Sequence, residues 1–182
     1  MGSRRDQILA TAAALFADRG FHGVSVAELG AACGVSGPAL YKHFPSKDAV
    51  LAEMLVSISE ELLEVGTSRS RAAPDAATAL RALVGWHVDF ALHHRPLIVV
   101  QDRDWSSLPG PARERVRELQ RAYVELWAGR LREHHTGLDR QRARAMAHAT
   151  FGLINSTPHS ALLPDAEMAD VLATMACASL GL

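Results

Sequence analysis

The sequence predicts an all-α protein of about nine helices, on three observations. Apolar residues recur at helical spacing along most of the 182-residue chain. No segment keeps the alternation of apolar and polar residues that marks a half-buried strand. The prolines separate the apolar stretches from one another. With 48% hydrophobic residues, the chain can also bury a sizeable core.

Two short helices are predicted near the N-terminus. An apolar stripe over residues 8–16 indicates a first helix that ends at Gly20. Ser25 and Glu28 have the spacing of a capping box, in which each residue bonds the other's backbone N–H. The second helix therefore begins at about residue 26, and Gly34 stops it.

A third short helix follows the glycine almost at once. Ser36 can cap it, and it runs to about Phe44. Gly34 can adopt a backbone conformation that other residues avoid, so the third helix can leave the second at a steep angle. Leu40 and Phe44, four residues apart, anchor one face to the core. Two short helices joined by a tight glycine turn have the layout of a helix-turn-helix.

The exposed face of the third helix suits double-stranded DNA. Ser36, Tyr41 and Lys42 can bond phosphate oxygens, and His43 can bond a phosphate or a base edge. Pro38 and Ala39 leave room for thymine methyl groups. Lys47, in the first turn of the next helix, is a further candidate for a phosphate contact.

The segment "LFADRGFHGVSVAELGAACGVSGPALYKHFPSKDAVL", residues 15–51, resembles the DNA-binding domain of tetracycline-repressor (TetR) family regulators. The resemblance implies a helix-turn-helix domain over residues 1–47 and a helical effector-binding and dimerisation domain over 48–182. It also implies a repressor that contacts a palindromic operator. Carried over by position, the DNA contacts are Ser25, Ala27, Ser36, Gly37, Pro38, Ala39, Tyr41, Lys42, His43 and Lys47.

Further helices are predicted beyond the third one. A fourth begins after Ser46 and runs to Gly66, and the polar segment 67–77 interrupts the pattern. The others cover roughly 75–94, a short stretch from Pro96, 109–134, 139–156 and 165–180.

A single recognition helix reads few base pairs, so such proteins usually dimerise on palindromes. The last two helices carry apolar stripes, and the family resemblance implies that they pair with their copies in a four-helix bundle. The alternative is that the stripes face the chain's own core. The candidate dimerisation residues are Met146, Thr150, Ile154, Met168, Val171, Leu172 and Met175.

The middle helices mix aromatic and polar residues in a way that is typical of small-molecule sites. Ordinary core packing is the alternative for any one of these residues. Since few cations flank them, we expect a largely apolar effector, such as an acyl thioester. The candidate effector-binding residues are Trp86, His87, Phe90, Gln101, Trp105, Tyr123, Trp127, His148, Phe151 and Asn155.

Two other function classes compete with a regulator. His87, His93, His94, Asp102 and Asp104 could hold the metal of a small helical enzyme, but their spacing matches no tight ligand set. A ligand-independent architectural protein would bind many DNA sequences alike. We expect no enzyme activity, metal or cofactor.

Composition and charge limit where the protein can be located and which partners it can bind. The net charge is −1, so any basic DNA-binding surface must be local. Two distant cysteines do not form a disulfide framework, and no apolar run reaches the length of a membrane span. These features predict a soluble cytoplasmic protein without a membrane partner.

Overall fold

The computed structural model describes residues 3–160 and 162–182, and of Gly37 and Pro38 only the backbone. Within this part of the chain the fold is all-α, as predicted, with no strand. Eight helices have seven residues or more, and two have four residues each. In order they are α1 (Arg4–Arg19), α2 (Val26–Ala32), α3 (Gly37–Leu40), α4 (Lys47–Ala72), α5 (Ala76–His93), α6 (Arg95–Asp104), the 3₁₀ turn η1 (Trp105–Ser107), α7 (Gly110–His134), α8 (Arg140–Ile154), α9 (Thr157–Ser160) and α10 (Asp165–Leu180).

The chain divides into two compact units, which we call the N-terminal unit and the C-terminal unit. The N-terminal unit contains residues up to Ile58 together with Pro96–Val116. The C-terminal unit contains Ser59–Arg95 and Arg117–Leu182. The N-terminal unit therefore extends beyond the predicted domain of residues 1–47, because the start of α4, α6 and the start of α7 share its core.

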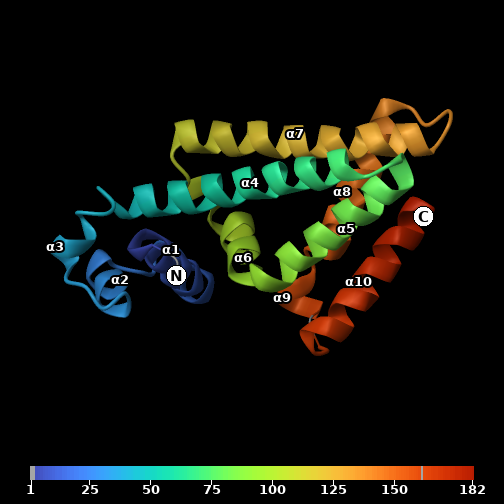
Figure 1. The fold of residues 1–182 in the computed structure, drawn as a ribbon. Coiled ribbons are helices and arrows are strands. Elements are labelled where there is room, and N and C mark those ends of the chain that lie inside the picture. The colour runs from blue at the N-terminus through green and yellow to red at the C-terminus, as the bar shows by residue number, and fades with distance from the viewer. Residues whose placement is uncertain (1–2, 161) are drawn as a thin grey trace. The chain divides into compact units, whose positions relative to one another are not determined.

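The core of the N-terminal unit forms where α1, α2 and α3 meet the first turns of α4 (Figure 1). Segment 96–116 adds three apolar residues to this core, Val100, Leu108 and Val116, each no more than 1% exposed. The helices contribute a longer set of buried side chains, which includes Ile8, Phe16, Leu29, Leu40, Phe44, Leu51 and Leu55.

The turn between α2 and α3 has the geometry that the sequence predicts. Gly34 has φ +66°, in the left-handed region. Its N–H donates to Ala31 O at 3.0 Å, and the N–H of Val35 donates to Gly30 O at 2.9 Å. This pair of bonds is a Schellman motif, which ends a helix by satisfying its last carbonyls. The bonds direct the chain into α3.

The regular part of the third helix is shorter than predicted. α3 ends at Leu40, and residues 41–43 continue as turns. The N–H of Lys42 donates to Ala39 O, and that of His43 donates to Leu40 O. These i→i+3 bonds tighten the last turn, as is common at helix ends.

The fourth helix is longer than predicted, because it continues through the polar segment to Ala72. Ser70 is fully buried, and Arg130 on α7 donates to its hydroxyl at 2.9 Å and to its carbonyl at 3.3 Å. The Arg69 guanidinium lies 5.0 Å from the centre of the Trp86 ring. These tertiary contacts hold a helix that local propensity does not predict.

In the C-terminal unit, α10 packs against both α5 and α8 (Figure 1). α5 is the most buried helix of this unit, with ten buried residues in eighteen. Its Trp86 donates to Leu62 O on α4 at 3.1 Å, and its Ala91 carbonyl accepts from Thr157 at 3.0 Å. α5 is therefore the helix around which the C-terminal unit is assembled.

Candidate functional site

The end of α3 presents a polar face beside a buried apolar one. Leu40 and Phe44 are 2% and 1% exposed, so they anchor the segment as predicted. Tyr41 is 52% exposed, Lys42 is exposed and His43 is half-buried. A phenol, an ammonium and an imidazole thus stand next to one another on a short, well-anchored segment.

Two arginines of the first turn of α1 hold this segment in place. Arg5 donates to His43 O at 2.6 Å and pairs with Glu53 on α4. Its guanidinium also lies 4.3 Å from the centre of the Phe44 ring. Arg4 donates to Cys33 O at the end of α2. Sequence reasoning missed both roles, because the bonds join positions 29 to 48 residues apart.

Lys47 is engaged inside the protein. Its Nζ donates to Phe21 O and to Val24 O, each at 2.7 Å, and lies 4.3 Å from the centre of the Phe21 ring. The start of α4 lies beside the loop that joins α1 to α2, whose carbonyls no helix satisfies. Two of the three ammonium donors are used there, so a phosphate could take only the third.

The serines that the sequence singled out cap their helices. Ser25 Oγ accepts from the N–H of Glu28 at 3.2 Å, and the N–H of Ser25 donates to the Glu28 carboxylate at 2.8 Å. The Ser25 hydroxyl also donates to this carboxylate at 2.7 Å, and this bond, followed by the bond from the Ser25 N–H, lowers the pKa of Glu28 below its ordinary value. Ser36 Oγ accepts from the N–H of Ala39 at 3.3 Å. Ser25, Ala27 and Ser36 are exposed, whereas Ala39 is half-buried. The predicted DNA contacts of Gly37 and Pro38 lie outside what the structure describes.

α6 is tied to the end of α1 by one arginine. Arg103 donates to Ala17 O at 3.0 Å and to Phe16 O, which are carbonyls of the last turn of α1. The buried Asp104 carboxylate lies 3.3 Å from the same guanidinium. A cation at a helix C-terminus is favourable because the carbonyls there carry partial negative charge.

In the C-terminal unit, four aromatic rings meet around His87 on α5, and we call the five side chains together the ring cluster. The imidazole stacks on Phe151, with ring centres 4.8 Å apart and an 18° angle between the planes. Tyr123 and Trp127, both on α7, lie 5.7 Å and 6.1 Å from His87 and 6.1 Å from each other, centre to centre. Phe90 lies 6.1 Å away on the same helix as His87.

Polar atoms are buried in this cluster. His87 Nε2 bonds Asn155 Oδ1 at 3.1 Å. Among the described residues, His87 Nδ1, Tyr123 Oη and Trp127 Nε1 have no hydrogen-bond partner of regular geometry. Burial lowers the pKa of His87 to about 4, and burial raises the pKa of Tyr123 above its usual range. Both side chains are therefore uncharged near pH 7.

The structure brings together most of the predicted effector-binding residues. Trp86 and Asn155 adjoin the ring cluster, and Arg69, which sequence reasoning missed, covers the Trp86 ring. His148 is exposed, with its ring centre 6.3 Å from that of Phe151.

Two predicted effector-binding residues lie in the N-terminal unit, not in the unit that contains the ring cluster, and their role stays a prediction. Gln101 lies on α6 and Trp105 on η1, both within Pro96–Val116. Trp105 packs against the core of the N-terminal unit. Its aromatic character reflects that core.

The predicted dimerisation residues fall into two groups. Thr150, Ile154, Met168 and Leu172 are at most 6% exposed and pack in the chain's own core, so they form no surface for a second copy. This is the alternative that the periodicity left open. Val171 and Met175 are 39% and 52% exposed on α10.

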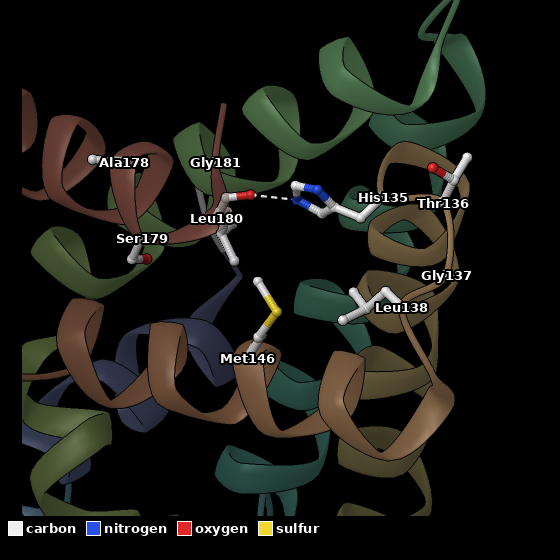
Figure 2. Close-up of a pocket in the computed structure, with 9 residues that line it drawn as sticks. All are labelled: His135, Thr136, Gly137, Leu138, Met146, Ala178, Ser179, Leu180 and Gly181. Atoms are coloured by element: carbon white, nitrogen blue, oxygen red, sulfur yellow. Dashed lines mark hydrogen bonds between the residues drawn. The ribbon is translucent and has the colours of Figure 1, made fainter.

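The remaining candidate, Met146, lines an open hollow of about 520 Å³. Figure 2 shows its side chain between Leu138, which precedes α8, and Leu180 at the end of α10. His135 Nε2 bonds Leu180 O at 2.7 Å across one side of the hollow (Figure 2). This bond ties the end of α10 to the end of α7.

The residues named for a metal site have other contacts. His87 bonds Asn155, His93 bonds its own helix at Asp89 O, and Asp104 lies beside Arg103. Across residues 3–160 and 162–182, no three His, Cys, Asp or Glu side chains converge as metal ligands would. Over the same residues, every helix is too short or too polar to cross a bilayer.

Comparison with known proteins matches both parts of the chain to one family. Residues 8–54 match the family described as "Bacterial regulatory proteins, tetR family". Residues 73–159 match "Tetracyclin repressor-like, C-terminal domain". Together these matches cover most of the chain.

Individual relatives agree with the family matches. The chain is 29% identical to the HTH-type transcriptional repressor KstR2 of Rhodococcus jostii over 127 residues, 69% of this chain and 62% of that protein. It is 36% identical to the HTH-type transcriptional activator FasR of Mycolicibacterium smegmatis over 90 residues, 50% of this chain and 41% of that protein. The matched part thus spans less than two thirds of either relative.

A solved structure extends the likeness to nearly the whole fold. A TetR-family transcriptional regulator from Bordetella parapertussis superposes with a TM-score of 0.83 and 26% identity, over 97% of this chain and 95% of that one. The overall fold of the chain thus occurs in a solved regulator structure. The chain belongs to the TetR family of regulators.

Proposed function

We propose that this protein is a DNA-binding transcriptional repressor that leaves a palindromic operator when a small, largely apolar effector binds its C-terminal unit. The observation that carries the proposal is the end of α3, where exposed Tyr41 and Lys42 adjoin buried Leu40 and Phe44. A recognition helix needs this combination of a fixed backbone and a free polar face. A regulator of this kind acts in the cytoplasm, where the DNA lies.

In the proposed complex, Ser36, Tyr41 and Lys42 bond phosphates, while His43 contacts a base edge or a phosphate. Ser25, which caps α2, and Ala27 in its first turn approach the DNA backbone. Because Lys47 already bonds two carbonyls, it contributes chiefly by holding the loop between α1 and α2 in place.

A second copy of the chain supplies the other half-site, about 34–36 Å away along the DNA. We place the dimer surface on the outer faces of α8 and α10. Val171 and Met175 are exposed there, and so are the small residues Ala149 and Gly152. A Cβ at Gly152 would meet nothing within 4 Å. Small side chains let two helices approach closely, as a four-helix bundle requires.

The effector site is proposed at the ring cluster and Trp86. Aromatic and aliphatic side chains dominate there, which favours an apolar effector such as an acyl thioester. Arg69 over Trp86 could meet an anionic group at the other end of such a molecule. Binding can release the DNA only if the effector prefers the conformation that does not fit the operator.

Repression is proposed over activation because the relative that matches the larger share of this chain is a repressor. KstR2 aligns with 69% of the chain and the activator FasR with 50%.

A genomic footprint of the purified protein tests the proposal. We expect protection of a few palindromic sites, with affinity that falls steeply as salt concentration rises. Tyr41→Ala and Lys42→Ala should weaken binding to the recovered site about tenfold each, since each removes a phosphate contact. The control Glu64→Ala changes an exposed residue of α4, outside the recognition segment and the proposed dimer surface, and should bind like the parent. Unselective protection, or two recognition-helix variants that bind like the parent, would contradict the proposal.

A further inference from the structure

The ring cluster holds three buried polar atoms that make no hydrogen bond of regular geometry among the described residues, although the Trp127 indole N–H lies close enough to the Tyr123 hydroxyl to act on its pKa. His87, Tyr123 and Trp127 are 2%, 3% and 0% exposed, and each carries one such atom. Folded proteins nearly always give a buried polar atom a partner, because an unpaired one loses its bonds to water without replacement. Three unpaired atoms on mutually contacting rings therefore call for an explanation.

The hydrogen-bonding character of the three atoms follows from their surroundings. His87 Nε2 faces the carbonyl oxygen of the Asn155 side chain, so Nε2 carries the proton and Nδ1 carries a lone pair. The Trp127 indole N–H can only donate, whereas the Tyr123 hydroxyl can donate and accept. The cluster thus offers one acceptor, one donor and one group of both kinds, all within rings whose centres lie 6.1 Å apart or less.

A charged group on the part of the ligand that contacts the ring cluster would be unfavourable. The imidazole is neutral near pH 7, because burial lowers the pKa of His87 to about 4. None of the five side chains of the cluster is a cation near pH 7, and Arg69 lies over Trp86, outside the cluster. A buried carboxylate or ammonium without a counter-charge would be strongly unfavourable in such a place.

We propose that His87, Tyr123 and Trp127 read an uncharged hydroxyl group on the buried end of the effector. A hydroxyl can donate to the imidazole lone pair and accept from the phenol or the indole, which a plain hydrocarbon end cannot do. This inference rests on the proposed effector site and adds the chemical class of the group that enters it. Asn155 acts as a positioning residue, since its bond to Nε2 fixes which imidazole nitrogen faces the ligand.

Matched pairs of compounds test the inference on the full-length protein without DNA. We would compare 2-naphthol with naphthalene, and the N-acetylcysteamine thioester of 8-hydroxyoctanoate, whose hydroxyl is at the end far from the thioester, with that of octanoate. Calorimetry and thermal shift give the affinities. We expect the hydroxylated member of at least one pair to bind about tenfold more tightly, because its partner leaves the buried polar atoms unpaired.

Tyr123→Phe removes one hydroxyl and keeps the ring. We expect this variant to lose most of the preference for the hydroxylated compound, while its ligand-free melting temperature stays equal or rises. The matched control is Tyr41→Phe, which makes the same change at the only other tyrosine, 52% exposed on the recognition segment. The control should keep the preference of the parent protein.

Several results would overturn the inference. These are equal affinity within both pairs, binding of no member of either pair, or a Tyr123→Phe protein that keeps the full preference. A lower melting temperature for ligand-free Tyr123→Phe would also overturn it, because the hydroxyl would then have a partner within the protein. None of these results bears on operator binding by the ligand-free protein. The genomic footprint therefore tests the proposed regulator function separately.

Discussion

The recognition segment of the N-terminal unit and the ring cluster of the C-terminal unit differ in how their polar groups are satisfied. In the N-terminal unit, long cationic side chains reach across the fold and bond carbonyls at helix ends or in loops. The cations that do so are Arg4, Arg5, Lys47 and Arg103. In the C-terminal unit, His87, Tyr123 and Trp127 each keep a polar atom without a protein partner among the described residues.

This difference matches what the two proposed tasks require. A surface that docks into a DNA groove must keep its backbone fixed, and satisfied carbonyls at helix ends fix it. An effector site gains affinity from polar atoms that remain unpaired until the ligand arrives. On this view the stability of the N-terminal unit depends on its internal bonds, and the ring cluster is as buried and uncharged as its geometry indicates.

The largest expected effect is on the anchor of the recognition segment. Phe44→Ala should lower the free energy of unfolding by about 3–5 kcal/mol, because it leaves a cavity in a core where the ring is 1% exposed. Urea denaturation followed by circular dichroism measures the change. Tyr41→Ala is the control, and it should stay within about 0.5 kcal/mol of the parent because its ring is exposed. Equal losses for the two variants would contradict the burial of Phe44.

The second prediction concerns acid sensitivity of the ring cluster. The pKa of His87 is lowered to about 4 in the folded protein and returns to about 6.5 on unfolding. Between these values the unfolded chain binds the extra proton, so stability is fully present above pH 6.5 and falls as pH drops toward 4. The loss amounts to about 3 kcal/mol.

Urea denaturation at several pH values checks this loss. His87→Gln should show a flatter dependence between pH 6.5 and 4, whereas His148→Gln, which changes an exposed histidine, should follow the parent. A His87→Gln protein that loses as much stability as the parent would mean that other groups titrate with folding in this range.

The third prediction separates the two lysines of the chain. Lys47→Met should lower the free energy of unfolding by about 2 kcal/mol, because two loop carbonyls lose a charged donor. Lys42→Met should leave stability unchanged, since the side chain is exposed. For DNA binding, Lys42→Met is the variant expected to have the effect: it should reduce the slope of log affinity against log salt concentration by about 0.9, the value for one phosphate contact.

Denaturation and salt titration of operator affinity together check this separation. If Lys47→Met changes the salt slope and leaves stability intact, Lys47 is a phosphate ligand in the complex and its two carbonyl bonds are dispensable.

How far the sequence predicts these features depends on how local their causes are. The capping box of Ser25 and Glu28 and the turn at Gly34 depend on residues within five positions of one another, so the residue types alone predict them. The same holds for the burial of Leu40 and Phe44, which follows from helical spacing.

Long-range bonds account for what sequence reasoning missed. The extension of α4 to Ala72 depends on Arg130 bonding Ser70, and the engagement of Lys47 depends on carbonyls more than twenty positions earlier. Likewise, an apolar stripe shows that one side of a helix is buried, but it does not show whether that side packs against the same chain or against a second copy. For this reason Ile154 and Leu172 were predicted at a dimer surface, although they face the chain's own core.

The smallest expected effect tests how tightly the ring cluster is packed against α4. A Cβ added at Gly66 would lie 2.8 Å from Tyr123 Cε2, so the tyrosine ring must move in Gly66→Ala. Overpacking of this kind costs about 2 kcal/mol, and the better helix propensity of alanine offsets about 1 kcal/mol of that loss. Gly85→Ala is the matched control: Gly85 also lies inside a helix, its added Cβ meets nothing within 4 Å, and it should gain about 1 kcal/mol. Urea denaturation of both variants should therefore place them about 2 kcal/mol apart. If Gly66→Ala is stabilised as much as Gly85→Ala, the Tyr123 ring is free to move away from α4, and the cluster is looser than its interatomic distances indicate.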